Sequence, residues 1–187
     1  MARSVTRRVP SYTPKVELIG DWKKTRALLF DLPLLVKQGT AAGQKSAAEK
    51  LLKIIKKNIR DNGGSIGWPP VSELYAKKKI GMGKDPNNLL VLTGLYYRSI
   101  NIYNKGTNYY VGIKKNTRNY ETGGRLTVAQ IATILEYGSY ANNIKARPLW
   151  GPSFKQFGGS KKIKSLITWH IARNIYARHK VRTKITF

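Results

Sequence analysis

Acid–base or metal chemistry in this protein would depend on two histidines and nine carboxylates. His170 falls beside Ile167 and Ile171 in a helical pattern, so we interpret it as a residue of a helix face. His179 lies in a basic tail, and no carboxylate stands near either histidine to orient an imidazole. The carboxylates are scattered, at Glu17, Asp21, Asp31, Glu49, Asp61, Glu73, Asp85, Glu121 and Glu136.

The spacing of these residues matches no catalytic or cofactor motif. A metal-dependent nuclease needs several carboxylates at one site, whereas Asp21 and Asp31 are better explained as helix caps. The sequence contains no HExxH, no Walker-type loop and no GxGxxG. It contains no cysteine, which excludes disulfides and thiolate metal sites. We therefore predict that the chain is not an enzyme, with no catalytic residue, no cofactor and no metal.

Charge is the most unusual property of the chain. Lys and Arg total 35 against 9 Asp and Glu, a formal net charge of +26. Every Asp and Glu lies at or before Glu136, so the remaining charged residues are all basic. Such an excess is either a solvated surface or a face that meets a polyanion or an acidic protein. The candidates for a basic docking face are Lys161, Lys162, Lys164, Arg173 and Arg178.

Several tyrosines gather in one short part of the chain, at Tyr96, Tyr97, Tyr103, Tyr109 and Tyr110. Aromatic residues pair well across the strands of a hairpin, and this is our interpretation of the group. The alternative is a platform on which the bases of a single strand stack.

The hydrophobic content of 41% predicts a folded chain of ordinary domain size. Residues 1–14 are predicted to be a flexible basic arm, and residues 15–187 a single α+β domain with a basic C-terminal extension. The segment 15–19 favours a short strand. No apolar run approaches the ~20 residues of a membrane span, so no membrane contact is expected.

The N-terminal third of the chain is predicted to be helical. Asp21 is expected to cap a short helix to about Phe30, and a long helix follows Pro33 and runs to about Arg60. Gly39 and Gly43 weaken its first part, so a break there is one alternative. Its apolar face carries Ala48, Leu51, Leu52, Ile55 and Ile59.

The rest of the chain predicts a hairpin and two more helices. Residues 62–88 are expected to be a long loop, 89–102 and 109–114 to pair as strands, and 115–125 to be another polar loop. Thr127 is expected to cap a helix that Gly138 ends. Ser160 is expected to cap a last helix with Ile163, Leu166, Ile167, Ile171 and Ile175 on its apolar side, and 181–187 alternate as an edge strand. The predicted fold is α+β: a long N-terminal helix and a C-terminal helix packed on a small antiparallel sheet.

Three segments within residues 67–155 share an order and a spacing. Gly-Trp-Pro-Pro-Val-Ser occupies 67–72, Leu-Val-Leu-Thr-Gly-Leu occupies 90–95, and Ile-Leu-Glu-Tyr-Gly at 134–138 precedes Ile-Lys-Ala-Arg-Pro-Leu at 144–149. They resemble the Trp-Pro loop, the L-x-x-T-G-x-L segment and the E-(F/Y)-G … P-A-R-P block of the virion-morphogenesis and minor-tail family of tailed phages. That family includes tail-completion, tail-terminator and neck proteins. Lys145 stands where the family usually has proline.

The resemblance implies a virion protein that forms a ring at the neck or tail end and joins the tail to the head connector. A hexamer is favoured, with adjacent connector, tube or sheath proteins as partners, after assembly in the host cytoplasm. Contact with genomic DNA in the lumen stays open, and the alternative function is a basic nucleic-acid-binding module. The candidate interface or structural residues are Trp68, Thr93, Gly94, Glu136, Gly138, Arg147 and Pro148.

Two of these residues suggest a contact. Arg147 precedes Pro148 and is therefore expected to be extended. In that conformation it is placed to pair with Glu136, in the same subunit or in the next. The alternative is that both residues only maintain the fold.

Overall fold

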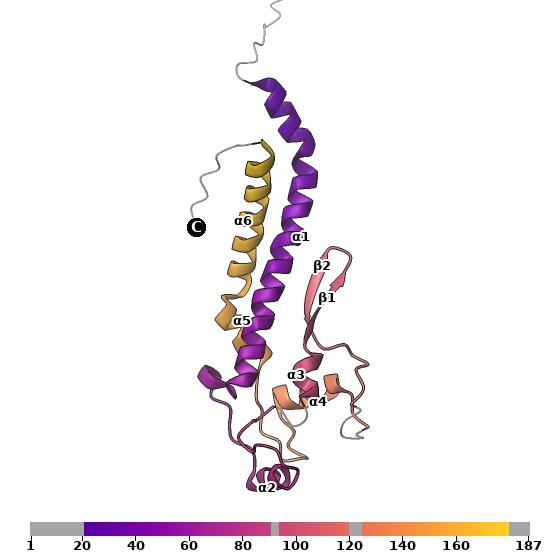
Figure 1. Cartoon of the computed structure of the whole chain (residues 1–187), viewed down its shortest axis with the longest axis vertical. Coiled ribbons are helices and arrows are strands. Elements are labelled where there is room, and N and C mark those ends of the chain that lie inside the picture. Colours follow the sequence, from indigo (N-terminus) through magenta and orange to yellow (C-terminus); the bar gives the residue numbers. More distant parts are fainter. Residues whose placement is uncertain (1–20, 91–93, 120–124, 180–187) are drawn as a thin grey trace, which may run out of the picture.

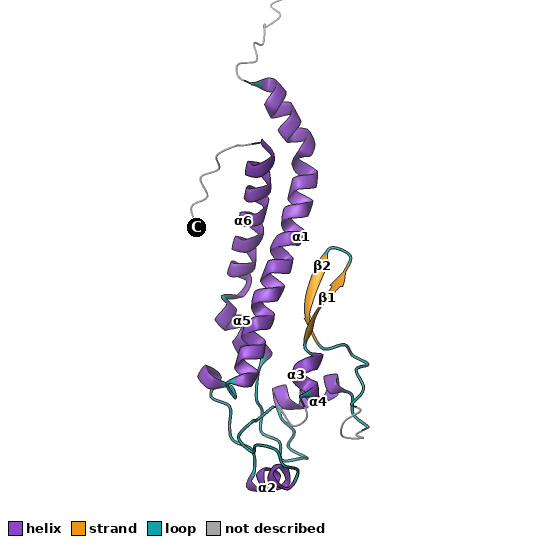
Figure 2. Ribbon diagram, in the orientation of Figure 1, coloured by secondary structure: helices purple, strands orange, loops and turns teal. Residues whose placement is uncertain are grey.

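The computed structural model describes residues 21–90, 94–119 and 125–179 (Figure 1). Within these ranges six α-helices and one two-stranded antiparallel sheet make up the structure, so the predicted α+β class is confirmed (Figure 2). The predicted arm, the strand at 15–19, Thr93 and the edge strand at 181–187 lie outside the described residues.

The longest element is α1, which runs from Trp22 to Arg60. Asp21 caps it as predicted, because its side chain accepts a hydrogen bond from Lys24 N at 3.2 Å. The predicted division near Phe30 is wrong, since α1 continues through Pro33. Asp31 does not cap a helix, and it pairs instead with Arg178 of the last helix at 3.3 Å. Pro33 removes one backbone hydrogen bond of α1, and packing against the last helix stabilises α1 in this region.

The last helix, α6 (Gly159–His179), begins one residue before the expected cap and lies antiparallel along α1 (Figure 1). At Gly39 and Gly43 the two backbones approach closely. A Cβ on Gly39 would lie 2.6 Å from Cα of Ile171, and one on Gly43 would lie 2.5 Å from Cα of Ile167. The glycines therefore do not break α1. They are the positions at which only a residue without a side chain fits.

The predicted hairpin is present, with β1 (Asn101–Lys105) paired to β2 (Asn108–Gly112) and Ile102 opposite Val111. Residues 95–99, however, form the short helix α3 (Leu95–Ser99) and not a strand. The hairpin packs on α1, and α1 lies between it and α6 (Figure 1). The expectation that the C-terminal helix packs on the sheet is therefore corrected, since α1 separates them.

The prediction that residues 62–88 form one long loop is also wrong. It contains a 3-10 turn, η1 (Gly64–Ile66), and the helix α2 (Glu73–Gly81). Ser72 caps α2 by accepting a hydrogen bond from Tyr75 N at 3.4 Å. A serine followed by an acidic residue is a helix-start signal that the sequence does contain.

Two further helices lie near the C-terminal half. Thr127 and Gln130 form a capping box for α4 (Val128–Tyr137), which Gly138 ends as predicted. A helix that was not predicted, α5 (Trp150–Phe157), precedes α6. Asn58 of α1 fixes α5 by donating to Ser153 Oγ and to Gln156 Oε1, both at 2.8 Å.

Two groups of buried side chains form the core. The larger group lies where α1 meets α3, α4 and the loops, and consists of Ile55, Ile59, Trp68, Leu90, Tyr96, Ile100, Val128, Ala132 and Leu149. The smaller group joins α1 to α5 and α6 through Ala47, Phe157 and Leu166. The larger group contains Ile55 and Ile59 of the face of α1 that was predicted to be apolar, and Leu51 of that face packs against both groups. No helix in the described ranges has both the length and the apolar character needed to cross a membrane.

Candidate functional site

Two of the motif segments meet in space although about 80 residues separate them. Trp68 is buried, and its Nε1 donates to the carbonyl of Pro148 at 2.8 Å. Gly63 packs directly against the indole, where a Cβ would lie 2.4 Å from Cδ2. We call the group formed by Trp68, Pro69, Pro70, Glu136, Arg147 and Pro148 the motif cluster.

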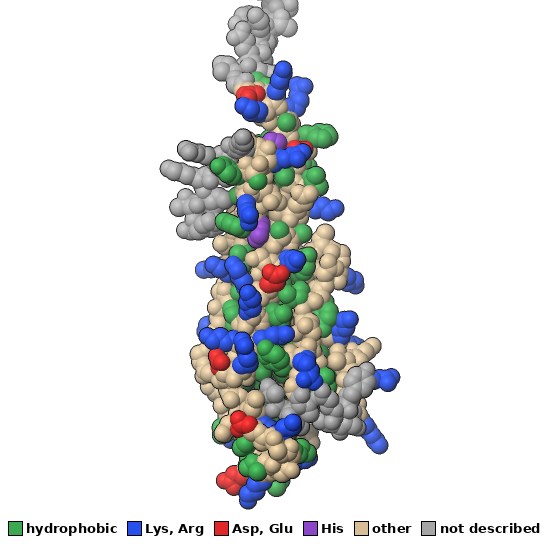
Figure 3. Space-filling view, viewed as in Figure 1, with side chains coloured by type: hydrophobic (Ala, Val, Ile, Leu, Met, Phe, Trp, Pro, Cys, Tyr) green, Lys and Arg blue, Asp and Glu red, His purple; other side chains and the backbone are tan. Residues whose placement is uncertain are grey.

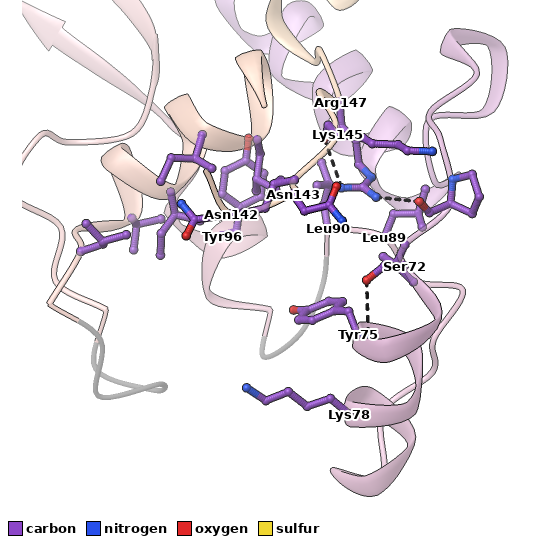
Figure 4. A pocket seen from close by; sticks show the side chains of 18 of the residues that line it. Ser72, Tyr75, Lys78, Leu89, Leu90, Tyr96, Asn142, Asn143, Lys145 and Arg147 are labelled. Carbon is purple, nitrogen blue, oxygen red and sulfur yellow. Dashed lines mark hydrogen bonds between the residues drawn. The ribbon is translucent and has the colours of Figure 1, made fainter. Parts of the chain in front are cut away.

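Arg147 is the centre of the motif cluster. Its side chain is only 6% exposed. Nη2 donates to the carbonyl of Pro70 at 2.9 Å (Figure 4). Nε donates to the carbonyl of Pro69 at 3.1 Å. Burial lowers the pKa of the guanidinium, and Tyr75 opposes that shift. The two carbonyls stabilise the buried charge because each one presents a partial negative charge to the planar donor fork.

Glu136, near the end of α4, supports a different backbone. Its carboxylate accepts hydrogen bonds from Leu149 N at 2.7 Å and from Trp150 N at 3.3 Å. It therefore caps the N-terminus of α5, where a negative charge is stabilising. The hypothesised pairing of Arg147 with Glu136 is wrong within the subunit, since each group has other partners. Arg147 is also too buried to reach a neighbouring subunit.

The glycines of the motif segments have unequal roles. Gly138 has φ +79°, and a Cβ there would lie 2.8 Å from the carbonyl oxygen of Ile144. That close approach accompanies the narrow bridge between Ser139 and Ile144. Gly94 has φ +81° and is the N-cap residue of α3, so it turns the chain into a helix and not into a strand. A Cβ on Gly94 would meet the end of the Arg98 side chain, which is flexible.

A pocket of about 1050 Å³ opens beside the motif cluster (Figure 4). It lies between α2, the segment that leads into α3, α4 and residues 142–147, and aliphatic side chains form much of its wall. Tyr75 and Lys78 project from α2 toward it. The charged side chains among its described lining residues are Lys78, Lys145 and Arg147, so its rim is basic.

Lys79 is a buried residue that the sequence did not single out. It is 1% exposed, and its Nζ donates to the carbonyl of Asn88. Lys84 N donates back to the carbonyl of Lys79 at 2.9 Å, so this lysine holds the loop after α2 in place. Burial lowers the pKa of Lys79, and the charge of Asp85 opposes the shift. Within the run of lysines 77–79 no local signal marks the buried one.

This lysine predicts a pH dependence. Because its pKa is lower in the folded chain than in the unfolded chain, the unfolded chain binds more protons at alkaline pH, and stability rises with pH in that window. The free energy of unfolding of the native chain should therefore rise relative to that of Lys79→Met as the pH increases toward 10.5, the ordinary pKa of lysine. Urea denaturation of both proteins across this range measures the difference. A difference that is constant or falls with pH would contradict the prediction.

The predicted basic docking face is exposed, but it is not one stripe. Lys161, Lys162 and Lys164 are exposed on the first turns of α6, and residues one and two apart on a helix point in different directions. Arg173 lies over the ring of Trp169 at 5.3 Å, and Arg178 pairs with Asp31 at 3.3 Å. Lysine and arginine side chains are spread over the whole visible surface (Figure 3).

The histidines lie on α6. His170 meets Trp169 edge-on, with ring centres 4.8 Å apart. The expectation that no carboxylate stands near either histidine is wrong for His179, whose Nε2 lies 3.5 Å from Oδ2 of Asp31 without forming a hydrogen bond. Among the described residues no group of three or more His, Asp or Glu side chains is arranged to hold a metal ion.

The fold therefore brings Trp68, Glu136, Arg147 and Pro148 together, with Gly138 beside them and Gly94 at the edge of the adjoining pocket. The chain matches no family model, no curated protein and no solved structure. The contacts of the motif cluster are structural. Its polar side chains hold separate segments of backbone together.

Proposed function

We propose that the chain is a structural protein of a tailed-phage virion, a single domain that closes into a ring at the neck or tail end and joins the tail to the head connector. The observation that carries this proposal is the meeting of the three segments on which the resemblance rests. Two of them are hydrogen-bonded through Trp68 and Arg147, and all three border one pocket. Segments that depend on one another in this way are expected to belong to one structural unit.

The surface near this unit is suited to subunit contacts. Leu74 of α2 is 81% exposed, and Tyr137 and Tyr140 on either side of Gly138 are also exposed. Exposed aliphatic and aromatic side chains next to an open apolar pocket are typical of protein interfaces. Side chains that project beside the pocket of one subunit can contact the surface of the next, and such head-to-tail contacts close into a ring when the rotation permits. Six-fold symmetry is expected, since the resemblance implies a six-fold tail as neighbour.

Electron microscopy of purified virions tests the proposal. The expected result is a six-fold ring of this chain between the head connector and the tail tube or sheath. Tyr137→Ser combined with Tyr140→Ser should leave the lone subunit folded but reduce the number of completed particles, because both side chains are exposed. Absence of the chain from purified virions, or its presence there only as a two-fold dimer, would refute the proposal.

Nucleic-acid binding is the second candidate, and the exposed lysines of α6 favour it. For a docking role we expect Gln substitutions at Lys161, Lys162 and Lys164 to slow association with an acidic neighbouring ring. For a DNA-binding role the same variant would bind duplex DNA more weakly, and the slope of log K against log salt would shrink by ~0.9 for each phosphate that the variant no longer neutralises. Titrations of the lone subunit with duplex DNA at several salt concentrations separate the two. We expect the slope of log K against log salt to be the same for the variant and the native chain.

A further inference from the structure

The first part of α1 exposes large apolar side chains to solvent. Phe30 is 87% exposed, Leu29 is 62% exposed and Leu34 is 57% exposed. In Figure 1 this part of α1 reaches past the tip of the hairpin and past the end of α6. Apolar side chains at three- and four-residue spacing share one side of a helix. Phe30 and Leu34 meet this spacing, and Leu29 lies further round the helix, so the three side chains mark the edges of one broad exposed strip. An exposed strip that no described element covers is a candidate contact surface.

Basic side chains lie within the same strip. Arg26 lies four residues before Phe30, and Lys37 lies three residues after Leu34, so they share its side of α1. The acidic residue of this part of α1 points elsewhere, because Asp31 pairs with Arg178 and lies next to His179 on the side that faces α6. We call the exposed strip formed by Arg26, Leu29, Phe30, Leu34 and Lys37 the outer α1 face.

We infer that the outer α1 face docks an acidic amphipathic helix of another protein. The leucines or other apolar side chains of that helix would cover Phe30 and Leu34, and its carboxylates would pair with Arg26 and Lys37. Recognition of an amphipathic helix through apolar anchors at helical spacing is a general mode of protein binding. This docking does not require that the partner be a virion protein.

The charge of the outer α1 face distinguishes three possible partners, which are a second copy of the chain, an anionic membrane and another protein. A second copy would bring its own Arg26 and Lys37 against those of the first, and like charges that face each other oppose association. On an anionic membrane the bases would have to flank the apolar strip, so that their ends could reach the head groups. Here they lie within the strip, where insertion would bury them. A protein partner can place a carboxylate opposite each base.

The probe for this inference is a labelled synthetic helix with leucines at three- and four-residue spacing and glutamates between them. Its binding to the full chain is measured by fluorescence anisotropy. A peptide with glutamine in place of every glutamate is the charge control, and we expect it to bind at least about tenfold more weakly. Replacing both bases, with Arg26→Gln and Lys37→Gln, should weaken binding of the glutamate peptide and reduce its salt dependence.

The apolar contact is tested with two matched double variants. Phe30→Ser with Leu34→Ser should weaken binding of the glutamate peptide at least about tenfold. Ile80→Ser with Met82→Ser removes exposed apolar side chains at the end of α2 and should leave binding unchanged. All four side chains are exposed, so thermal unfolding should be nearly the same in both variants.

Four outcomes would overturn the inference. The first is equal binding of the peptide to both double variants, and the second is no measurable binding to the native chain. The third is binding to phosphatidylcholine–phosphatidylglycerol vesicles that Phe30→Ser with Leu34→Ser abolishes, which would assign the face to a membrane. The fourth is self-association in sedimentation experiments that the same variant abolishes, which would assign the face to a second copy.

Discussion

Replacing Gly43 by alanine is expected to lower the free energy of unfolding by about 3 kcal/mol, because the new Cβ would overlap the backbone of α6. The Cβ would lie 2.5 Å from Cα of Ile167 and 2.9 Å from its backbone nitrogen. A backbone cannot move aside as the end of a side chain can, so α1 and α6 must separate. Their separation would also disturb the packing of Ala47 with Phe157 and Leu166.

Chemical denaturation of Gly43→Ala measures this destabilisation, and Gly151→Ala is its matched control. Gly151 lies in α5, and a Cβ there meets no atom within 4 Å. Alanine is favoured over glycine in a helix by up to about 1 kcal/mol, so this variant should be as stable as the native chain or more stable. If both variants gain stability, the close packing of α1 on α6 is wrong.

Replacing Arg147 by alanine is expected to cost about 3 kcal/mol of folding free energy. The substitution leaves the carbonyls of Pro69 and Pro70 without the donors they have in the folded chain, and it removes the group that ties the segment after Trp68 to the segment before α5. Arg147→Lys should recover little of this free energy. A single ammonium cannot reproduce the planar fork that meets two carbonyls, and its charge would stay buried.

Denaturation of Arg147→Ala and Arg147→Lys is compared with that of Arg178→Ala. Arg178 makes an ion pair with Asp31, but its side chain is 67% exposed. An exposed pair of this kind contributes at most about 1 kcal/mol, so the control should be almost as stable as the native chain. Near-ultraviolet circular dichroism should change for the Arg147 variants, since Trp68 lies in the same cluster. Equal stability of the lysine variant and the native chain would show that the fork is not required.

Local signals in the sequence were sufficient for several elements. Thr127 and Gln130 lie three residues apart and bond to each other's backbone, so the start of α4 is decided within one turn. The paired strands around Gly106 are also decided locally, by a turn that favours a glycine with positive φ. The apolar spacing of Ile55 and Ile59 predicted their burial because the period of a helix is fixed by its backbone.

The start of α2 carries a local signal that competes with its surroundings. Ser72 and Glu73 are a cap and a first-turn acid, but the neighbouring glycines, prolines and lysines favour a loop. In the segment that leads into α3, the apolar residues from Leu89 suggest a strand. Gly94 begins a helix instead, since its positive φ redirects the chain.

Other features were decided only by the tertiary structure, because the groups that interact are far apart in the sequence. The cap of α5 is Glu136, which belongs to another helix, so residues 149–157 carry no local cap signal. Gly39 and Gly43 predict a weak helix by themselves and become packing positions only when α6 lies against them.

Tertiary structure also decides which lysines are buried and which are exposed. Lys79 is buried and its two preceding lysines are not, and the difference comes from the carbonyl of Asn88 that the fold places beside its amine. The sequence determined which residues are basic, which segments are helical by period and where tight turns occur. Which bases face solvent, which charge meets which carbonyl and which glycine touches a backbone were decided by tertiary packing, since each depends on a partner supplied by a distant segment.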